Sequence, residues 1–188
     1  MHSAYVGVQT AEKHIKYDHQ KPAGIAQILF CVIAGFLLVF IQNALFISGG
    51  PNLVLVFALL IATKGRPNLA IAFAAVSGFT IDLVFGRYLG FYGLLFTVAA
   101  IGTAFLRDKL ETKPRVIAYA VPVLFVFNLL ESFLTRVLAV LFGGSSVLYT
   151  SFGANFVRVI LPGFLYDTVT LLIFIFPVYI LWRRLTPH

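Results

Sequence analysis

Charged residues are scarce in this sequence of 188 residues. They make up 11% of the chain, whereas a soluble domain averages about 25%. Hydrophobic residues make up 60%, and the mean hydropathy is +0.96. With so few polar residues, the chain cannot cover an apolar core with a water-facing shell. The composition excludes a soluble globular domain and indicates that lipid surrounds most of the side chains.

Cysteine and histidine are also missing from most of the chain. Cys31 is the only cysteine, which excludes an intrachain disulfide and a cysteine-based metal site. The four histidines all lie in the terminal tails, at His2, His14, His19 and His188. We therefore expect neither a histidine proton relay nor a metal centre inside the membrane, and we predict no cofactor.

Motifs typical of enzymes are absent as well. The sequence has no HExxH zinc motif, no GxSxG nucleophile elbow and no Walker or GxGxxG phosphate loop. It also lacks the soluble basic patch with aromatic residues that nucleic-acid binding requires. The sequence thus predicts a protein that is not an enzyme and does not bind nucleic acid.

Six apolar runs are present instead, and each is predicted to form a helix. In hydrocarbon, backbone N–H and C=O groups must be hydrogen-bonded within the segment. The runs cover 24–46, 52–63, 68–85, 88–106, 116–142 and 156–182. The second is shorter than the roughly 20 residues that cross a bilayer, so it crosses near the normal, starts inside the preceding turn or thins the bilayer. Pro122 is expected to kink the fifth helix.

The fold prediction is an all-α polytopic membrane protein with six transmembrane helices. A polar N-terminal tail, 1–22, precedes one transmembrane domain, 23–188. The first apolar run is too long for a cleaved signal and no A-x-A site follows it, so we expect this helix to be retained.

Basic residues predict the orientation of the bundle. If the six runs alternate in direction, eleven of the fourteen lysines and arginines fall on one side. The positive-inside rule makes this side the cytoplasm, so both termini are expected there. The basic side is also expected to contact anionic lipids. The eleven are Lys13, Lys16, Lys21, Lys64, Arg66, Arg107, Lys109, Lys113, Arg115, Arg183 and Arg184.

Three acids and the three remaining bases lie within or near the outer half of the predicted membrane region. They are Asp82, Glu131 and Asp167, and Arg87, Arg136 and Arg158. An isolated charge at the bilayer centre costs about 2.5–3.5 kcal/mol on insertion scales, so these residues should turn inward and pair. Asp82 lies about one helical turn from Arg87, whereas Glu131 and Arg136 occupy different faces of one helix. Two interpretations stay open: a site for a ligand or partner helix, or a structural ion-pair network.

Small residues recur on the third and fourth predicted helices. Ala70, Ala74 and Gly78 are spaced by four residues, and the same face continues to Asp82 and Gly86. The fourth helix carries a similar set: Gly90, Gly93, Thr97, Ala100 and Ala104. Such faces let helix backbones approach closely in lipid. We predict a tight hairpin packed along these stripes.

The fifth helix carries a polar stripe. Asn128, Glu131 and Thr135 share one face, with Ser132 and Arg136 beside it. A polar stripe in a membrane helix must face protein or water. The sequence leaves open whether it lines a cavity or binds a helix of another protein.

Three segments carry a resemblance to a known family. Residues 78–90 read GFTIDLVFGRYLG, residues 51–55 read PNLVL, and residues 161–167 read LPGFLYD, followed by PVY at 177–179. Over about residues 25–185 the chain resembles the rod shape-determining protein MreD family, whose pattern GxxxDxxxGxxxG matches the first segment. The matching positions that we single out are Gly78, Asp82, Gly86, Gly90, Pro162 and Asp167, with Asp82 and Asp167 as core or interface anchors.

The resemblance implies a membrane subunit of the bacterial cell-elongation complex, in the cytoplasmic membrane. Such proteins are expected to bind MreC and, through it, to connect MreB to RodA and a class B penicillin-binding protein. Their fold is similar to the S component of energy-coupling-factor vitamin transporters. An S-component-like subunit that binds a small molecule, such as a vitamin, is the alternative function. A lipid-modifying enzyme using Asp82, Glu131 and Asp167 is a third.

Overall fold

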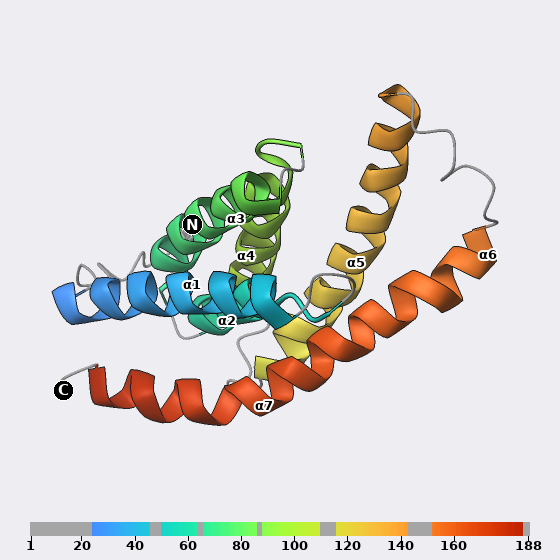
Figure 1. Cartoon of the computed structure of the whole chain (residues 1–188). Helices are drawn as coiled ribbons and strands as arrows, with labels where there is room; N and C mark the ends of the chain where they lie inside the picture. The colour runs from blue at the N-terminus through green and yellow to red at the C-terminus, as the bar shows by residue number, and fades with distance from the viewer. Residues whose placement is uncertain are drawn as a thin grey trace, which may run out of the picture.

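The computed structural model describes residues 24–45, 50–63, 66–85, 88–109, 116–142 and 152–185, and its elements are all helices (Figure 1). The tail 1–22 and two candidate residues, Gly86 and Arg87, lie outside the described residues. The elements are α1 (Ile25–Leu45), α2 (Leu53–Thr63), α3 (Pro67–Phe85), α4 (Phe91–Lys109), α5 (Val116–Leu141), α6 (Phe152–Asn155), the π-helix η2 (Phe156–Ile160) and α7 (Leu161–Leu185).

Five helical segments are long and apolar enough to cross a membrane. The last of them runs continuously through α6, η2 and α7, over Gly153–Arg184. Large apolar side chains cover the outer faces of these helices, including Phe36 and Phe40 on α1, Phe133 on α5 and Phe176 on α7. Such faces suit acyl chains rather than water. The helices and their outer surfaces are those of a polytopic membrane protein, as the composition predicts.

Helix α2 is the exception to this pattern. It has 11 residues and all of them are buried. At 1.5 Å per residue it is about 16 Å long, roughly half the thickness of the hydrocarbon. Helices α1, α3, α4, α5 and α7 all contact it. The second predicted span is therefore a short helix enclosed by the long ones.

Side chains from other helices hold both ends of α2. At its start, Asn52 N donates to Asp167 Oδ1 (2.7 Å) and Val54 N donates to Gln42 Oε1 (3.4 Å). At its end, Arg107 Nη1 donates to the carbonyl oxygen of Ala62 (3.2 Å). Helix ends leave backbone groups without intrahelical partners, and the helix dipole favours an anion at the start and a cation at the end. These contacts allow a short helix to be buried in the bundle.

Helices α3 and α4 form the tight hairpin that the small residues predict. Ala70, Ala74 and Gly78 are buried on α3, and Gly93 and Ala100 are buried on α4. A Cβ atom at Gly78 would lie 2.6 Å from the carbonyl oxygen of Tyr92 and 2.8 Å from Gly93 Cα. The two backbones therefore meet at Gly78, where only glycine leaves enough room.

Gly90 has a different role from the predicted one. It lies in the turn before α4, which begins at Phe91, and a Cβ atom there would meet nothing within 4 Å. Its φ angle is +86°, a left-handed conformation that glycine adopts readily. The expectation that Gly90 packs against α3 is therefore wrong, and its requirement for glycine comes from the backbone of the turn.

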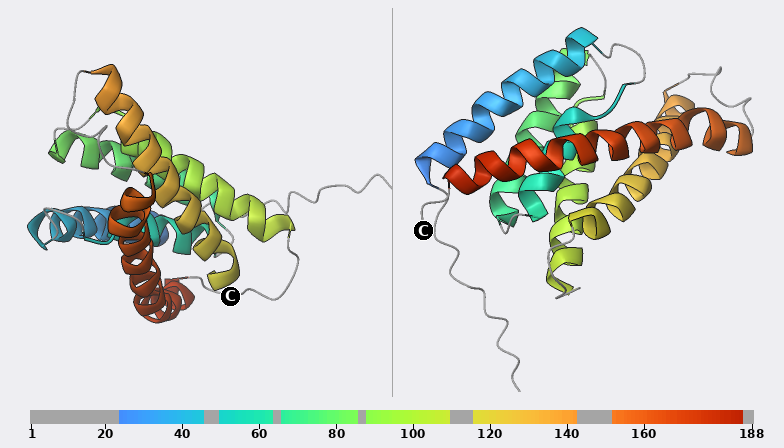
Figure 2. Two further views of the ribbon diagram at one scale, coloured as in Figure 1. Left: turned by 90° about the vertical axis from the view of Figure 1, so that its right-hand side faces the viewer. Right: turned by 90° about the horizontal axis from the view of Figure 1, so that it is seen from below.

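The beginning of α1 and the end of α7 lie at the same side of the bundle (Figures 1 and 2). The assignment of that side to the cytoplasm, like the likeness to S components, stays a prediction.

Candidate functional site

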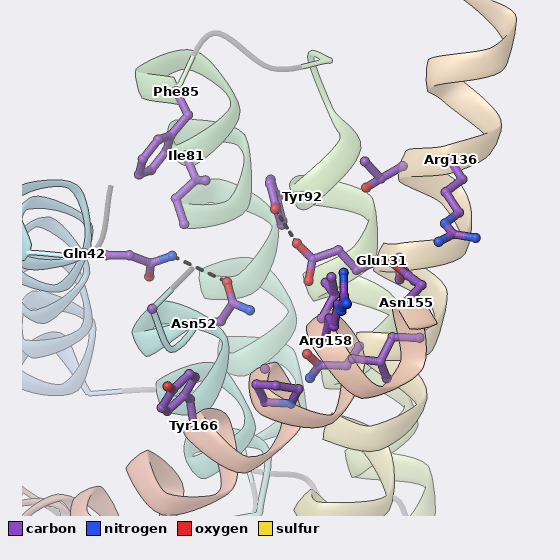
Figure 3. A pocket seen from close by; sticks show the side chains of 18 residues that line it. Gln42, Asn52, Ile81, Phe85, Tyr92, Glu131, Arg136, Asn155, Arg158 and Tyr166 are labelled. Atoms are coloured by element: carbon purple, nitrogen blue, oxygen red, sulfur yellow. Dashed lines mark hydrogen bonds between the residues drawn. The ribbon is translucent and has the colours of Figure 1, made fainter. Parts of the chain in front are cut away.

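A polar cavity of about 730 Å³ lies between the second half of α5, η2 and the start of α7 (Figure 3). The end of α3, the start of α4 and the segment before α2 complete its walls. Gln42 and Asn52 lie on one side, and Glu131, Arg136 and Arg158 lie on the other. The cavity therefore gathers residues from every described helix except α2.

The polar stripe of α5 faces this cavity. Asn128, Glu131, Ser132, Thr135 and Arg136 all line it. The sequence leaves open whether this stripe lines a cavity or binds a helix of another protein. In the single chain the stripe lines a cavity.

Three of the six predicted charges meet here. Glu131 and Arg136 come from α5, and Arg158 comes from η2. The hydroxyl of Tyr92 on α4 donates a hydrogen bond to Glu131 Oε1 (Figure 3). Just before η2, Asn155 Nδ2 donates a hydrogen bond to Ser132 Oγ (2.6 Å), which links α6 to α5. The cavity thus contains two guanidinium groups and one carboxylate, and hydrogen bonds fix its walls.

Asp82 does not line the cavity but holds the start of α4. Its side chain is buried, and its carboxylate accepts hydrogen bonds from Tyr92 N (3.1 Å) and Gly93 N (3.3 Å). These amides are at the helix N-terminus, where they have no intrahelical partner and where the dipole favours an anion. Arg87, the predicted neighbour of Asp82, lies outside the described residues.

Asp167 plays the same part for α2. It is 1% exposed, and it accepts from Asn52 N and from Asn128 Nδ2 (2.9 Å). The partners of Asp82 and Asp167 in the described chain are thus N–H groups, and not the arginines that the ion-pair interpretation assigns to them. Two N–H donors and a helix dipole satisfy a buried carboxylate without a second long side chain.

Pro162 and the π-helix shape one wall of the cavity. Pro162 has no N–H, so it cannot donate to the carbonyl of the residue four positions earlier, Arg158. The helix is wider just before it, and Leu161 N donates to the carbonyl oxygen of Phe156. π-Turns of this kind occur frequently at functional sites. Here the turn carries Arg158 to the cavity.

Gly163, next to Pro162, lets α5 and α7 approach. A Cβ atom at Gly163 would lie 2.6 Å from Asn128 Oδ1. Glycine at this position leaves room for the Asn128 side chain, whose amide reaches Asp167. The sequence shows this residue within the LPGFLYD segment but gives no sign of that contact.

Several residues of the site escape prediction from the sequence. Gln42 and Tyr92 are not among the predicted site residues, although each makes a hydrogen bond between helices. For Gln42 a signal existed, since it is a polar residue inside an apolar run. For Tyr92 nothing in the sequence distinguishes it from other tyrosines near a membrane boundary.

Comparison with known proteins gives one match. The family model described as rod shape-determining protein MreD matches residues 20–185. No curated protein and no solved structure matches the chain. The matched residues include every helix of the bundle and all of the cavity.

Proposed function

Because the chain belongs to the rod shape-determining protein MreD family, we propose that it is a non-enzymatic membrane subunit of the bacterial cell-elongation complex. The observation that carries this proposal is the family match, which extends over residues 20–185. We place the protein in the cytoplasmic membrane, with both termini in the cytoplasm, because eleven basic residues share the predicted inner side.

The chemistry of the buried acids supports a role without catalysis. Asp82 and Asp167 are engaged with backbone amides at the starts of α4 and α2. A general acid or base must instead reach the proton that it transfers. Among the described residues, no group of three or more histidines, cysteines and acids could hold a metal ion. These carboxylates are suited to fixing helices in place.

The proposed activity is binding of MreC within the membrane. Through MreC, the subunit would connect MreB filaments to RodA and a class B penicillin-binding protein and so help to control cell shape and peptidoglycan synthesis. Helix-to-helix contact in lipid depends on close packing of side chains. The long apolar outer faces of α1, α5 and α7 offer such surfaces for a single transmembrane helix.

Co-purification tests this function. The chain, tagged at its C-terminus and extracted from bacterial membranes in a mild detergent, is expected to bring down MreC in amounts comparable to its own. An unrelated polytopic protein with the same tag serves as the control and should bring down none. Recovery of a well-folded chain without MreC, in several mild detergents, would contradict the proposal.

The second candidate function is a transport subunit that binds a small molecule such as a vitamin, in the manner of S components. The observation in its favour is the cavity, because small-molecule sites commonly have volumes of about 300–1,000 Å³ and a few polar groups. Mass spectrometry of the purified protein would reveal a tightly bound vitamin. Absence of any such ligand, together with no rescue of vitamin uptake, would remove this candidate.

A further inference from the structure

The charges in the cavity do not balance. Arg136 and Arg158 carry two positive charges, and Glu131 carries one negative charge. Residues 24–106 and 116–182 contain only two other acids, Asp82 and Asp167, and neither lines the cavity. The three side chains together therefore carry one net positive charge. A net charge at membrane depth is costly unless a counter-ion approaches it.

The geometry of the cationic groups favours an oxyanion. Guanidinium groups present their N–H donors in a planar fork that matches phosphate or carboxylate oxygens. Arg136 lies on α5 and Arg158 on η2, and both line the cavity; in Figure 3 Arg158 lies next to Glu131, and Arg136 lies further along α5. Two arginines from different elements thus line one cavity.

The surroundings of Arg158 favour an anion that is attached to an apolar tail. Val157 and Val159, on either side of Arg158 in η2, are both exposed on the helix surface, and Val159 also lines the cavity. Phe133 is exposed on α5. A lipid can therefore place its headgroup in the cavity while its chains lie along the apolar outer surfaces of η2 and α5. Phosphate is the oxyanion that phospholipids carry.

We propose that this cavity binds a phosphate ester, carried by an anionic phospholipid, through Arg136 and Arg158. The same chemistry would accept a soluble phosphate ester, and the experiment below separates the two sources. Glu131, which accepts a hydrogen bond from the Tyr92 hydroxyl, lines the same cavity. This site does not depend on partner binding, so it can be tested on the isolated protein.

Thermal unfolding of the purified full chain in a neutral detergent provides the test. The probes are phosphatidylglycerol, phosphatidylcholine with the same acyl chains, and glycerol 3-phosphate. A ligand that binds the folded state raises the midpoint of unfolding in a concentration-dependent way, which yields its Kd. We expect phosphatidylglycerol to raise the midpoint clearly more than phosphatidylcholine does. The emission of Trp182, the only tryptophan, reports unfolding.

Three variants locate the site. Hydrogen bonds to charged groups contribute about 1.5–3 kcal/mol, so Arg158→Gln and Arg136→Gln are each expected to weaken phosphatidylglycerol binding roughly tenfold to a hundredfold. Arg184→Gln removes the same charge from the exposed end of α7, outside the cavity, and should leave the Kd unchanged. If Arg158→Gln fails to fold, Arg158→Lys keeps the charge but loses the planar fork and should still weaken binding.

Each outcome decides the proposal. Selective binding of phosphatidylglycerol that is lost in the cavity variants supports it, with a lipid as the source. Equal binding of glycerol 3-phosphate, lost in the same variants, also supports the phosphate site and assigns a soluble source. Phosphatidylcholine carries the same phosphate ester, so equal stabilisation by the two lipids would overturn the proposal if the cavity variants retained it. Equal effects of the cavity variants and Arg184→Gln would also overturn it.

Discussion

Gly78→Ala is expected to destabilise the folded chain by about 1–3 kcal/mol, because overfilling a tightly packed contact forces backbone shifts. The new Cβ atom would lie 2.6 Å from the carbonyl oxygen of Tyr92 and 2.7 Å from its carbonyl carbon. Both atoms belong to the backbone of α4, so a change of side-chain rotamer cannot relieve the clash. Gly78→Leu should have a larger effect in the same direction. Unfolding in mixed detergent micelles, followed by circular dichroism, measures the change.

Gly102→Ala is the matched control for this prediction. Gly102 is also in the hairpin, on α4, but a Cβ atom there would meet only Val123 Cγ2, at an ordinary 3.9 Å. Alanine is favoured over glycine inside a helix by roughly 0.5–1 kcal/mol. The control variant should therefore be as stable as the parent or more stable. Equal stability of the Gly78 and Gly102 variants would show that α3 and α4 do not meet at Gly78.

Asp167→Ala is expected to destabilise the protein by about 2–4 kcal/mol, since each buried polar group left without a partner costs about 1–3 kcal/mol. The substitution removes the acceptor of Asn52 N at the start of α2 and one acceptor of the Asn128 amide. Because α2 contacts five other helices, loosening its start should disturb the whole bundle. The same unfolding experiment measures the loss.

Asp167→Asn separates the hydrogen bonds of Asp167 from its charge, and Asp108→Asn serves as an exposed control. Asp167→Asn keeps one acceptor oxygen, which can serve either Asn52 N or the Asn128 amide, and places an N–H₂ donor at the other contact. One of the two hydrogen bonds is therefore lost, and we expect a loss of stability smaller than that of Asp167→Ala. Asp108→Asn removes an acid that is 63% exposed and pairs with Arg107. Exposed pairs contribute at most about 1 kcal/mol. A loss for Asp108→Asn as large as that for Asp167→Ala would contradict the role given to Asp167.

The helices themselves are well predicted by the sequence, because their cause is local. An apolar run in lipid must satisfy its own backbone, so its length and its ends can be read from residue type alone. The expected spans 24–46 and 116–142 differ little from α1 (Ile25–Leu45) and α5 (Val116–Leu141). The Gly78 contact is predictable for the same reason, since a stripe of small residues marks a close approach.

The partners of the charged residues are not predictable in this way. Counting acids and bases suggests ion pairs, but Asp82 and Asp167 accept from backbone amides that lie 10 and 115 residues away along the chain, at the starts of α4 and α2. Every residue offers such amides, so composition gives no sign of them. The cavity also depends on tertiary packing, because η2 brings Arg158 to the polar stripe of α5. These contacts are set by how the helices pack.

The claim on which the proposed site depends is that the polar cavity opens on the outer side of the membrane, opposite the basic loops. Ser132 lines the cavity, and Ser132→Cys changes its size little. In spheroplasts, a membrane-impermeant maleimide should label Ser132→Cys from outside, whereas the parent chain, whose only cysteine is the buried Cys31, should remain unlabelled. Labelling of Ser132→Cys only in inverted membranes, where the cytoplasmic face is exposed, would contradict the account.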